Sequence, residues 1–273
     1  MVDYKEKYGK TLGLIKSPTD PRDYNFSDVL VCAPRVKIPD NYIQELPPFI
    51  YDQGNSSMCC ACAYNTIRYM QESKRDQSEL TEPLSPCFTY GNRNPMDIYE
   101  GMLLRNCAKK GREGSVLFSE LPHFCSVQKA VKYVKDRKDE LLKKAEPFRI
   151  SSFYTAKTKE EIQRGIMETG AVLVGIPVYE CFYTPDEEGR IIYDPETCGE
   201  NFGGHAQVFC MWRTDENGKL WWGSINSWSD SWGQNGMSWI PEDYPLMDDA
   251  YVLVDEVTET KFKEYKEQFY GKE

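Results

Sequence analysis

A cysteine at the junction of a Gly/Ser loop and a helical pattern is the residue best suited to covalent chemistry in this sequence. Cys59 directly follows the loop Gln53–Met58 and begins a run of apolar residues with helical spacing. The unpaired N–H groups at a helix N-terminus, and the positive end of the helix dipole, favour thiolate over thiol. We therefore predict that Cys59 is a nucleophile.

A side-chain amide six positions before Cys59 supports the same prediction. Gln53 lies on the loop and can direct an N–H donor toward the point on which the Cys59 backbone N–H converges. Two donors that converge on one point stabilise the oxyanion of a tetrahedral intermediate. We assign Gln53 to such an oxyanion hole.

A cysteine nucleophile needs a base, and the chain contains two histidines. His123 lies in a loop after a proline, without polar companions. His205 begins a predicted strand directly after Gly203 and Gly204, whose lack of side chains lets a substrate approach closely. We predict His205 as the base and Gly204 as a substrate-binding residue.

A catalytic imidazole also needs a third group that holds its tautomer and orientation. Asn226, at the end of the next predicted strand, fills this role if the hairpin returns it beside His205. Trp228 would then cover the hydrogen bond and exclude water, and we include it among the substrate-binding residues.

The same cysteine region also contains a C-x-x-C pattern, Cys59 to Cys62, which suggests two other chemistries. A thiol–disulfide oxidoreductase would need a thioredoxin-type βαβ context, which the following sequence does not provide. A zinc site would need a second Cys or His pair at finger spacing. We expect no metal and no cofactor, and keep the oxidoreductase as an alternative.

The elements that must position these residues change character along the chain. The first half predicts helices and the second half predicts strands, which indicates an α+β protein with a cleft between two domains. The expected helices span residues 59–75, a short segment after 81–86, 97–110, 126–145 and, from a capping box at Thr158, 158–170. The expected strands span residues 171–178, 190–193, 205–212, 220–225, 236–240 and 251–254, with a hairpin turn at 215–218.

Four segments follow from this pattern. Residues 1–45 read as an extended leader because Pro18 and Pro21 interrupt any helix there. Residues 46–146 form the helical domain, 147–257 the β-rich domain, and 258–273 a charged helical tail. We expect the leader to lie on the surface and to shield the cleft.

The composition limits partners and compartment. The 273 residues carry a net charge of −10, which argues against nucleic acid or an anionic membrane as the main partner. No apolar run reaches the roughly 18 residues of a membrane span, and the charged N-terminus does not resemble a signal peptide. As written, the chain is expected to be a cytoplasmic monomer. Its ten cysteines lack a disulfide-scaffold spacing, so we expect mostly reduced, buried thiols.

The motifs together resemble those of papain-like cysteine peptidases, the papain and cathepsin family, and in particular its compact bacterial and viral members. The resemblance covers roughly residues 45–255. The matching motifs are Gln53-Gly54, Cys59, Gly204-His205-Ala206 and Asn226-Ser227-Trp228-Ser229-Asp230-Ser231-Trp232-Gly233-Gln234-Asn235-Gly236.

This resemblance implies a helical left domain that supplies the nucleophile and a β-barrel-like right domain that supplies histidine and asparagine. It implies a thiolate–imidazolium pair of Cys59 and His205, oriented by Asn226, with Gln53 in the oxyanion hole. A glycine on the left wall would bind the substrate backbone, and Gly101 is the nearest counterpart. The implied substrate is a peptide or protein, and no cofactor is implied.

Several positions depart from the family pattern. Cys60 stands where the family has Trp, Ser56 where it has a half-cystine, and Ser229 where it has glycine. The leader is also shorter than the usual helical propeptide. These departures keep open a second function, an inactive binding protein with the papain fold.

Overall fold

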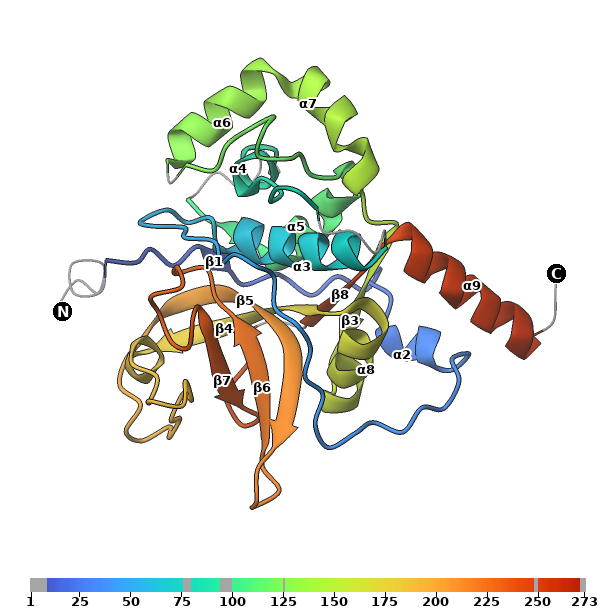
Figure 1. The fold of residues 1–273 in the computed structure, drawn as a ribbon, viewed down its shortest axis with the longest axis vertical. Coiled ribbons are helices and arrows are strands. Elements are labelled where there is room, and N and C mark those ends of the chain that lie inside the picture. The colour runs from blue at the N-terminus through green and yellow to red at the C-terminus, as the bar shows by residue number, and fades with distance from the viewer. Residues whose placement is uncertain (1–8, 76–79, 94–99, 125, 248–249, 271–273) are drawn as a thin grey trace.

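A long buried helix separates the helices α4 to α7 from a curled sheet, beside which α2 (Phe26–Leu30) and α8 (Lys159–Thr169) lie (Figure 1). The computed structural model describes residues 9–75, 80–93, 100–124, 126–247 and 250–270. Helices α4 to α7 lie on one side of α3, and a curled sheet lies on the other (Figure 1). The helical elements of the first half are α3 (Cys59–Arg75), α4 (Pro86–Gly91), α5 (Leu104–Lys110), α6 (Val127–Asp136) and α7 (Lys138–Ala145).

The sheet joins strands from both ends of the chain. Its order is β2-β1-β5-β4-β8-β3, with β6 paired to β5 and β7 paired to β6. The strands are β1 (Leu14–Ile15), β2 (Met102–Leu103), β3 (Ser152–Ala156), β4 (Val172–Tyr179), β5 (Asn201–Thr214), β6 (Leu220–Ile225), β7 (Met237–Pro241) and β8 (Ala250–Val254). β5 is therefore the strand that connects the hairpin of β6 and β7 to the rest of the sheet.

Helix α3 confirms the predicted bounds and forms the centre of the molecule. Residues 59–72 of this helix are buried almost all the way round, because helices pack on one side and β5 and β4 on the other. Gln71 donates hydrogen bonds to the carbonyl oxygens of Thr169 and Leu253 on the sheet side. The helix that begins at Cys59 is thus held rigidly between the two halves.

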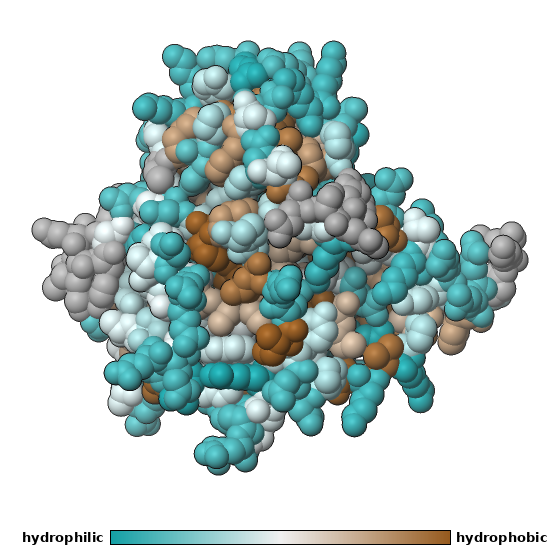
Figure 2. All heavy atoms as spheres, viewed as in Figure 1, coloured by the Kyte–Doolittle hydropathy of each residue, from teal (hydrophilic) through white to brown (hydrophobic). Residues whose placement is uncertain are grey.

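The predicted helix over residues 126–145 is interrupted. Ser126 caps α6 as expected, by accepting a hydrogen bond from the Lys129 N–H. Arg137 then leaves the helical conformation, with φ −123°, and α7 starts after it. Polar side chains cover this part of the surface, at the top of Figure 2, as expected for a solvated face.

The remaining predicted elements include one that is confirmed and one that was wrong. Thr158 and Glu161 form the predicted capping box of α8 (Lys159–Thr169), which ends at Gly170 with φ 88°. Residues 190–193 form only one isolated bridge, Arg190 with Trp239, so the predicted strand there was wrong. β3 was not predicted from the sequence.

The predicted helix over residues 97–110 was wrong at its start. Residues 97–99 lie outside the described residues, and Met102 and Leu103 form a strand before α5 begins. The Met102 N–H donates to the carbonyl oxygen of Gly13 at 2.8 Å. A tertiary partner in the leader therefore draws this segment out of its helical preference.

The described part of the leader, residues 9–45, is mostly extended and crosses both halves, as Figure 1 shows. It is not confined to the surface, however. A short helix, α2 (Phe26–Leu30), buries Phe26 and Val29 against the sheet side, and Leu14 is buried in the core cluster shared by α3 and the sheet. Asn25 and Tyr42 form isolated bridges to Thr155 and Trp212.

Most of the described cysteines are buried thiols outside any disulfide, as expected. Seven of them form no disulfide, whereas Cys181 and Cys198 are joined by one. Cys125 lies outside the described residues. The bridge joins η3 (Glu180–Tyr183) to the segment that leads into β5.

The tail forms helix α9 (Glu256–Tyr270), which projects from the body as Figure 1 shows. Phe262 anchors it against Phe26, with ring centroids 5.9 Å apart. Within the described residues, every helix is too short or too polar to cross a bilayer.

Candidate active site

The predicted nucleophile and the predicted base meet where α3 faces the sheet. Cys59 is the first residue of α3 and His205 lies on β5, and both are completely buried. Burial alone raises the pKa of the Cys59 thiol. Hydrogen bonds from Cys60 and His205, the charge of His205 and a backbone hydrogen bond with Ala206 outweigh burial and hold this pKa well below its usual value.

The predicted orienting residue is in contact with the same imidazole. His205 Nε2 lies 2.7 Å from Asn226 Oδ1. Because an amide oxygen only accepts, Nε2 must carry a proton. Nδ1 is buried and makes no conventional hydrogen bond to the described residues, so it is the ring nitrogen left for the Cys59 thiol.

Aromatic rings cover the pair of His205 and Asn226. Trp228 stacks on His205 with centroids 4.8 Å apart, and Phe182 and Tyr183 pack on the indole from behind. Trp228 is only 1% exposed. It therefore lies in the predicted cover and has no free surface for a substrate, which corrects its placement among the substrate-binding residues.

Two residues that surround Asn226 were not predicted from the sequence as part of the site. Gln207, fully buried on β5, donates from Nε2 to Asn226 Oδ1 at 2.9 Å. Ser224 on β6 donates from its hydroxyl to Gln207 Oε1 at 2.7 Å. The available signal was an amide two residues after His205, on the same face of the strand.

Gln53 is buried in the loop before Cys59, and both ends of its amide are engaged. Its Oε1 accepts from the Ser227 hydroxyl at 2.6 Å, and its backbone N–H donates to the Ser227 carbonyl. Its Nε2 donates to the carbonyl oxygens of Ser56 and Thr11, each at 2.8 Å. The donor predicted for the oxyanion is thus bound to the leader.

The leader runs between the two predicted substrate-binding glycines. A Cβ on Gly101 would lie 2.7 Å from the Gly13 carbonyl oxygen, and a Cβ on Gly204 would lie 2.7 Å from that of Leu14. Leu14 pairs with Met102 on one side and with Gly204 on the other. β1 therefore fills the space between the two segments that carry these glycines.

The wall around Gly101 is held by a tyrosine. The Gly101 N–H donates to the hydroxyl of Tyr90 at 2.8 Å. That hydroxyl lies 2.7 Å from the hydroxyl of Ser57, two residues before Cys59. Tyr90 is completely buried, so it joins the loop before the nucleophile to the strand that contacts the leader.

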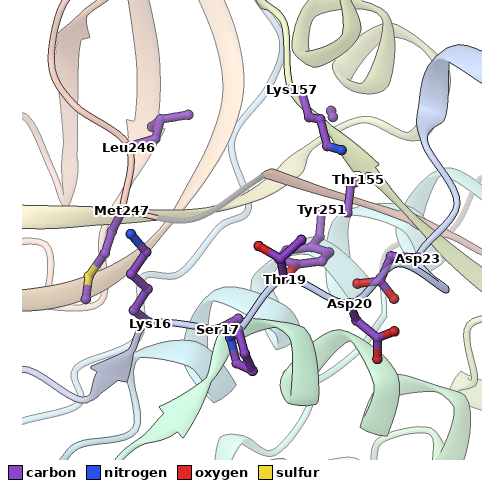
Figure 3. A pocket seen from close by; sticks show the side chains of 12 residues that line it. Lys16, Ser17, Thr19, Asp20, Asp23, Thr155, Lys157, Leu246, Met247 and Tyr251 are labelled. Atoms are coloured by element: carbon purple, nitrogen blue, oxygen red, sulfur yellow. The ribbon is translucent and has the colours of Figure 1, made fainter.

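Farther along, the leader is anchored by charge. Arg105 on α5 binds both carboxylate oxygens of Asp23 at 2.6 Å and lies 2.9 Å from Asp20. A cavity of about 420 Å³ lies between this part of the leader and the sheet. Figure 3 shows Lys16 and Met247 at one end of the cavity and Asp20 and Asp23 at the other.

The other histidine is engaged elsewhere. His123 Nε2 lies 2.8 Å from the Asp52 carbonyl oxygen, and Nδ1 lies 3.8 Å from the Cys87 sulfur. Among the described residues, no three His, Cys, Asp or Glu side chains cluster in a way that could hold a metal ion.

Comparison with known proteins adds a family match. Residues 102–249 match the model of the papain family cysteine proteases. This range contains His205 and Asn226 and begins after Cys59.

A cathepsin B-like cysteine proteinase 4 of Caenorhabditis elegans is 36% identical over 89 residues, which are 33% of this chain and 25% of that protein. A cathepsin B-like cysteine proteinase 3 of Ostertagia ostertagi is 38% identical over 86 residues, 32% of this chain and 47% of that protein. The matches thus span between a quarter and a half of these relatives.

Solved structures extend the likeness in fold to most of the chain. Xylellain, a cysteine protease from Xylella fastidiosa, aligns with a TM-score of 0.74 and 21% identity over 91% of this chain and 97% of its own. A procathepsin B from Trypanosoma congolense aligns with a TM-score of 0.67 and 15% identity over 94% of this chain and 89% of that protein. The predicted fold class, α+β with two domains in the papain-like arrangement, is confirmed.

Proposed function

Because the chain belongs to the papain family of cysteine proteases, we propose that it hydrolyses peptide bonds with Cys59 as nucleophile. The observation that carries the proposal is the convergence of Cys59 on α3, His205 on β5 and Asn226 just after β6. The lowered pKa of Cys59 agrees with it, because the thiolate is the attacking species. The proposed substrate is a peptide or protein.

The proposed reaction is acyl transfer through a thioester. The Cys59 thiolate attacks the peptide carbonyl carbon, and the resulting oxyanion accepts hydrogen bonds from Gln53 Nε2 and the Cys59 N–H. The His205 imidazolium gives its proton to the leaving amine as the C–N bond breaks. His205 then takes a proton from water, whose oxygen attacks the thioester carbon; the C–S bond breaks, the acid is released, and the Cys59 thiolate and the His205 imidazolium are restored.

A peptide-library cleavage assay tests this proposal. We expect the full chain to cleave peptides and the Cys59→Ala variant to be inactive, with kcat/KM lower by about 10⁴-fold. Equal cleavage by both proteins would place the nucleophile elsewhere. No cleavage by either, with a folded protein, would favour the papain-fold binding protein.

The leader gives the proposed enzyme a latent form. Thr11 holds the Gln53 donor, and β1 fills the groove between Gly101 and Gly204. A substrate needs the same donor and the same walls, so leader and substrate exclude one another. Gly13 is central to this arrangement because a side chain there would overlap the backbone of Ser57.

The hydrogen bond from Gly101 to Tyr90 leads to a prediction about substrate binding. We expect Tyr90→Phe, in a chain that also carries Gly13→Val to displace the leader, to raise KM about fivefold with kcat changed less than twofold. The lost hydroxyl leaves the buried Gly101 N–H unpaired, at a cost of about 1 kcal/mol. Steady-state kinetics measure the effect. Tyr64→Phe is the matched control, because it removes another buried hydroxyl, which contacts Gly111. An equal rise in KM in both variants would contradict the assignment.

A further inference from the structure

We propose that Gln207 is a positioning residue that fixes the amide orientation of Asn226 and, through it, the tautomer of His205. This inference rests on the proposed peptidase function and adds a fourth side chain to its site. The family resemblance did not point to Gln207, which lies two residues after His205 on β5.

The first step is the number of donors that face one oxygen. Asn226 Oδ1 lies 2.7 Å from His205 Nε2, 2.9 Å from Gln207 Nε2 and 2.7 Å from the Ser227 backbone N–H. On the other side of this amide, Asn226 Nδ2 is buried and has no hydrogen-bond partner among the described residues. Reversing the amide would turn its NH₂ group toward the N–H donors of Gln207 and Ser227, which is unfavourable.

The second step is that Gln207 is itself oriented. Its Oε1 accepts from the Ser224 hydroxyl at 2.7 Å, which leaves Nε2 to face Asn226. Gln207 and Ser224 are both fully buried, so water does not compete for these bonds. Ser224 thus donates to Gln207 and Gln207 donates to Asn226, whose Oδ1 also accepts the N–H of His205.

The chemical consequence concerns which imidazole nitrogen holds the proton. With Oδ1 facing the ring, a neutral His205 must be protonated on Nε2, and Nδ1 is free to accept the proton of Cys59. With the amide reversed, Nε2 would accept from NH₂ and the proton would move to Nδ1, where the ring could not act as a base toward the thiol. Gln207 therefore selects the productive tautomer.

The tautomer can be observed directly, because the chain has only two histidines. We suggest ¹⁵N-histidine NMR of the full chain carrying Cys59→Ala, at a pH where the imidazole is neutral, with His123→Gln to assign the signals. We expect His205 protonated on Nε2 with Gln207 present. Gln207→Met, which lacks the donor, should give a mixture of tautomers. Gln207→Glu, whose carboxylate faces Oδ1, should shift the proton to Nδ1.

Kinetics of the variants with Cys59 present give the second readout. We expect kcat to fall about tenfold in Gln207→Met and roughly 100-fold in Gln207→Glu, with KM within twofold, because a wrong tautomer impairs proton transfer and not binding. Ser224→Ala should also lower kcat, by a smaller factor than either Gln207 variant. Gln163→Met on α8, the same change at another buried glutamine, should leave kcat and the His205 signals unchanged.

The outcomes separate this inference from the proposed function. If His205 stays protonated on Nε2 alone in both Gln207 variants, the positioning role is overturned whether or not the protein cleaves peptides. A loss of kcat that only parallels a fall in melting temperature, with unchanged NMR signals, would likewise reduce Gln207 to a packing residue. An altered tautomer in a chain without peptidase activity would support Gln207 and count against the proposed function.

Discussion

Replacing His205 by alanine is expected to lower kcat/KM for peptide hydrolysis by about 10⁴-fold and to reduce the thiolate fraction of Cys59 near pH 6. An ordinary thiol with a pKa of about 8.5 is only about 0.3% thiolate at pH 6. Burial raises the pKa of Cys59, but the hydrogen bonds from Cys60, His205 and Ala206 and the charge of His205 together lower it well below its usual value, so we expect a much larger thiolate fraction in the unchanged protein. Without the imidazole, its hydrogen bond and its charge are lost while burial remains, so we expect the pKa of Cys59 to rise and the thiolate fraction near pH 6 to fall.

The measurement is the pH dependence of thiolate absorbance, with a Cys59→Ala protein subtracted, together with peptide turnover. Absorbance requires no access to the buried sulfur, so it can be recorded on the full chain. His123→Ala is the matched control, because that imidazole contacts Asp52 and Cys87 and is expected to leave the Cys59 titration unchanged. A titration of Cys59 that is the same with and without His205 would refute the proposed pair.

Replacing Gly13 by valine is expected to activate the full chain by up to roughly 100-fold. A Cβ at this position would overlap the carbonyl group of Ser57, which is backbone at the start of the nucleophile helix and cannot move aside. Overpacking of this kind costs about 3 kcal/mol, which is roughly 100-fold in the equilibrium between a covered and an open groove. The leader should therefore leave the groove while α2 and the Tyr42 bridge keep its later part attached.

Initial rates with a peptide substrate, and the rate of Cys59 alkylation by iodoacetamide, both measure this opening. Gly9→Ala is the control within the same leader, because no atom lies within 4 Å of a Cβ at that position. We expect Gly9→Ala to behave like the unchanged chain. If Gly13→Val has the melting temperature and both rates of the unchanged chain, the leader does not block the groove.

The local elements that the sequence determined are those in which local preference and burial agree. α3 begins and ends where the apolar spacing predicted, because it is buried on nearly every side and nothing opposes its helical preference. The capping box of α8 and the hairpin between β5 and β6 depend on residues adjacent in the chain. Cys59, His205 and Asn226 could be chosen as candidates because few residue types can do this chemistry.

The tertiary structure decided what depends on partners distant in the sequence. Met102 and Leu103 became a strand because the Gly13 carbonyl offered a hydrogen bond across the groove. The engagement of Gln53 by Thr11 and the burial of Trp228 behind His205 likewise join segments far apart in the chain. The amide of Gln207 acquired a role only when β5 and β6 placed it between Ser224 and Asn226. A sequence records which groups can donate or accept a proton, but only the folded chain determines which partner each one meets.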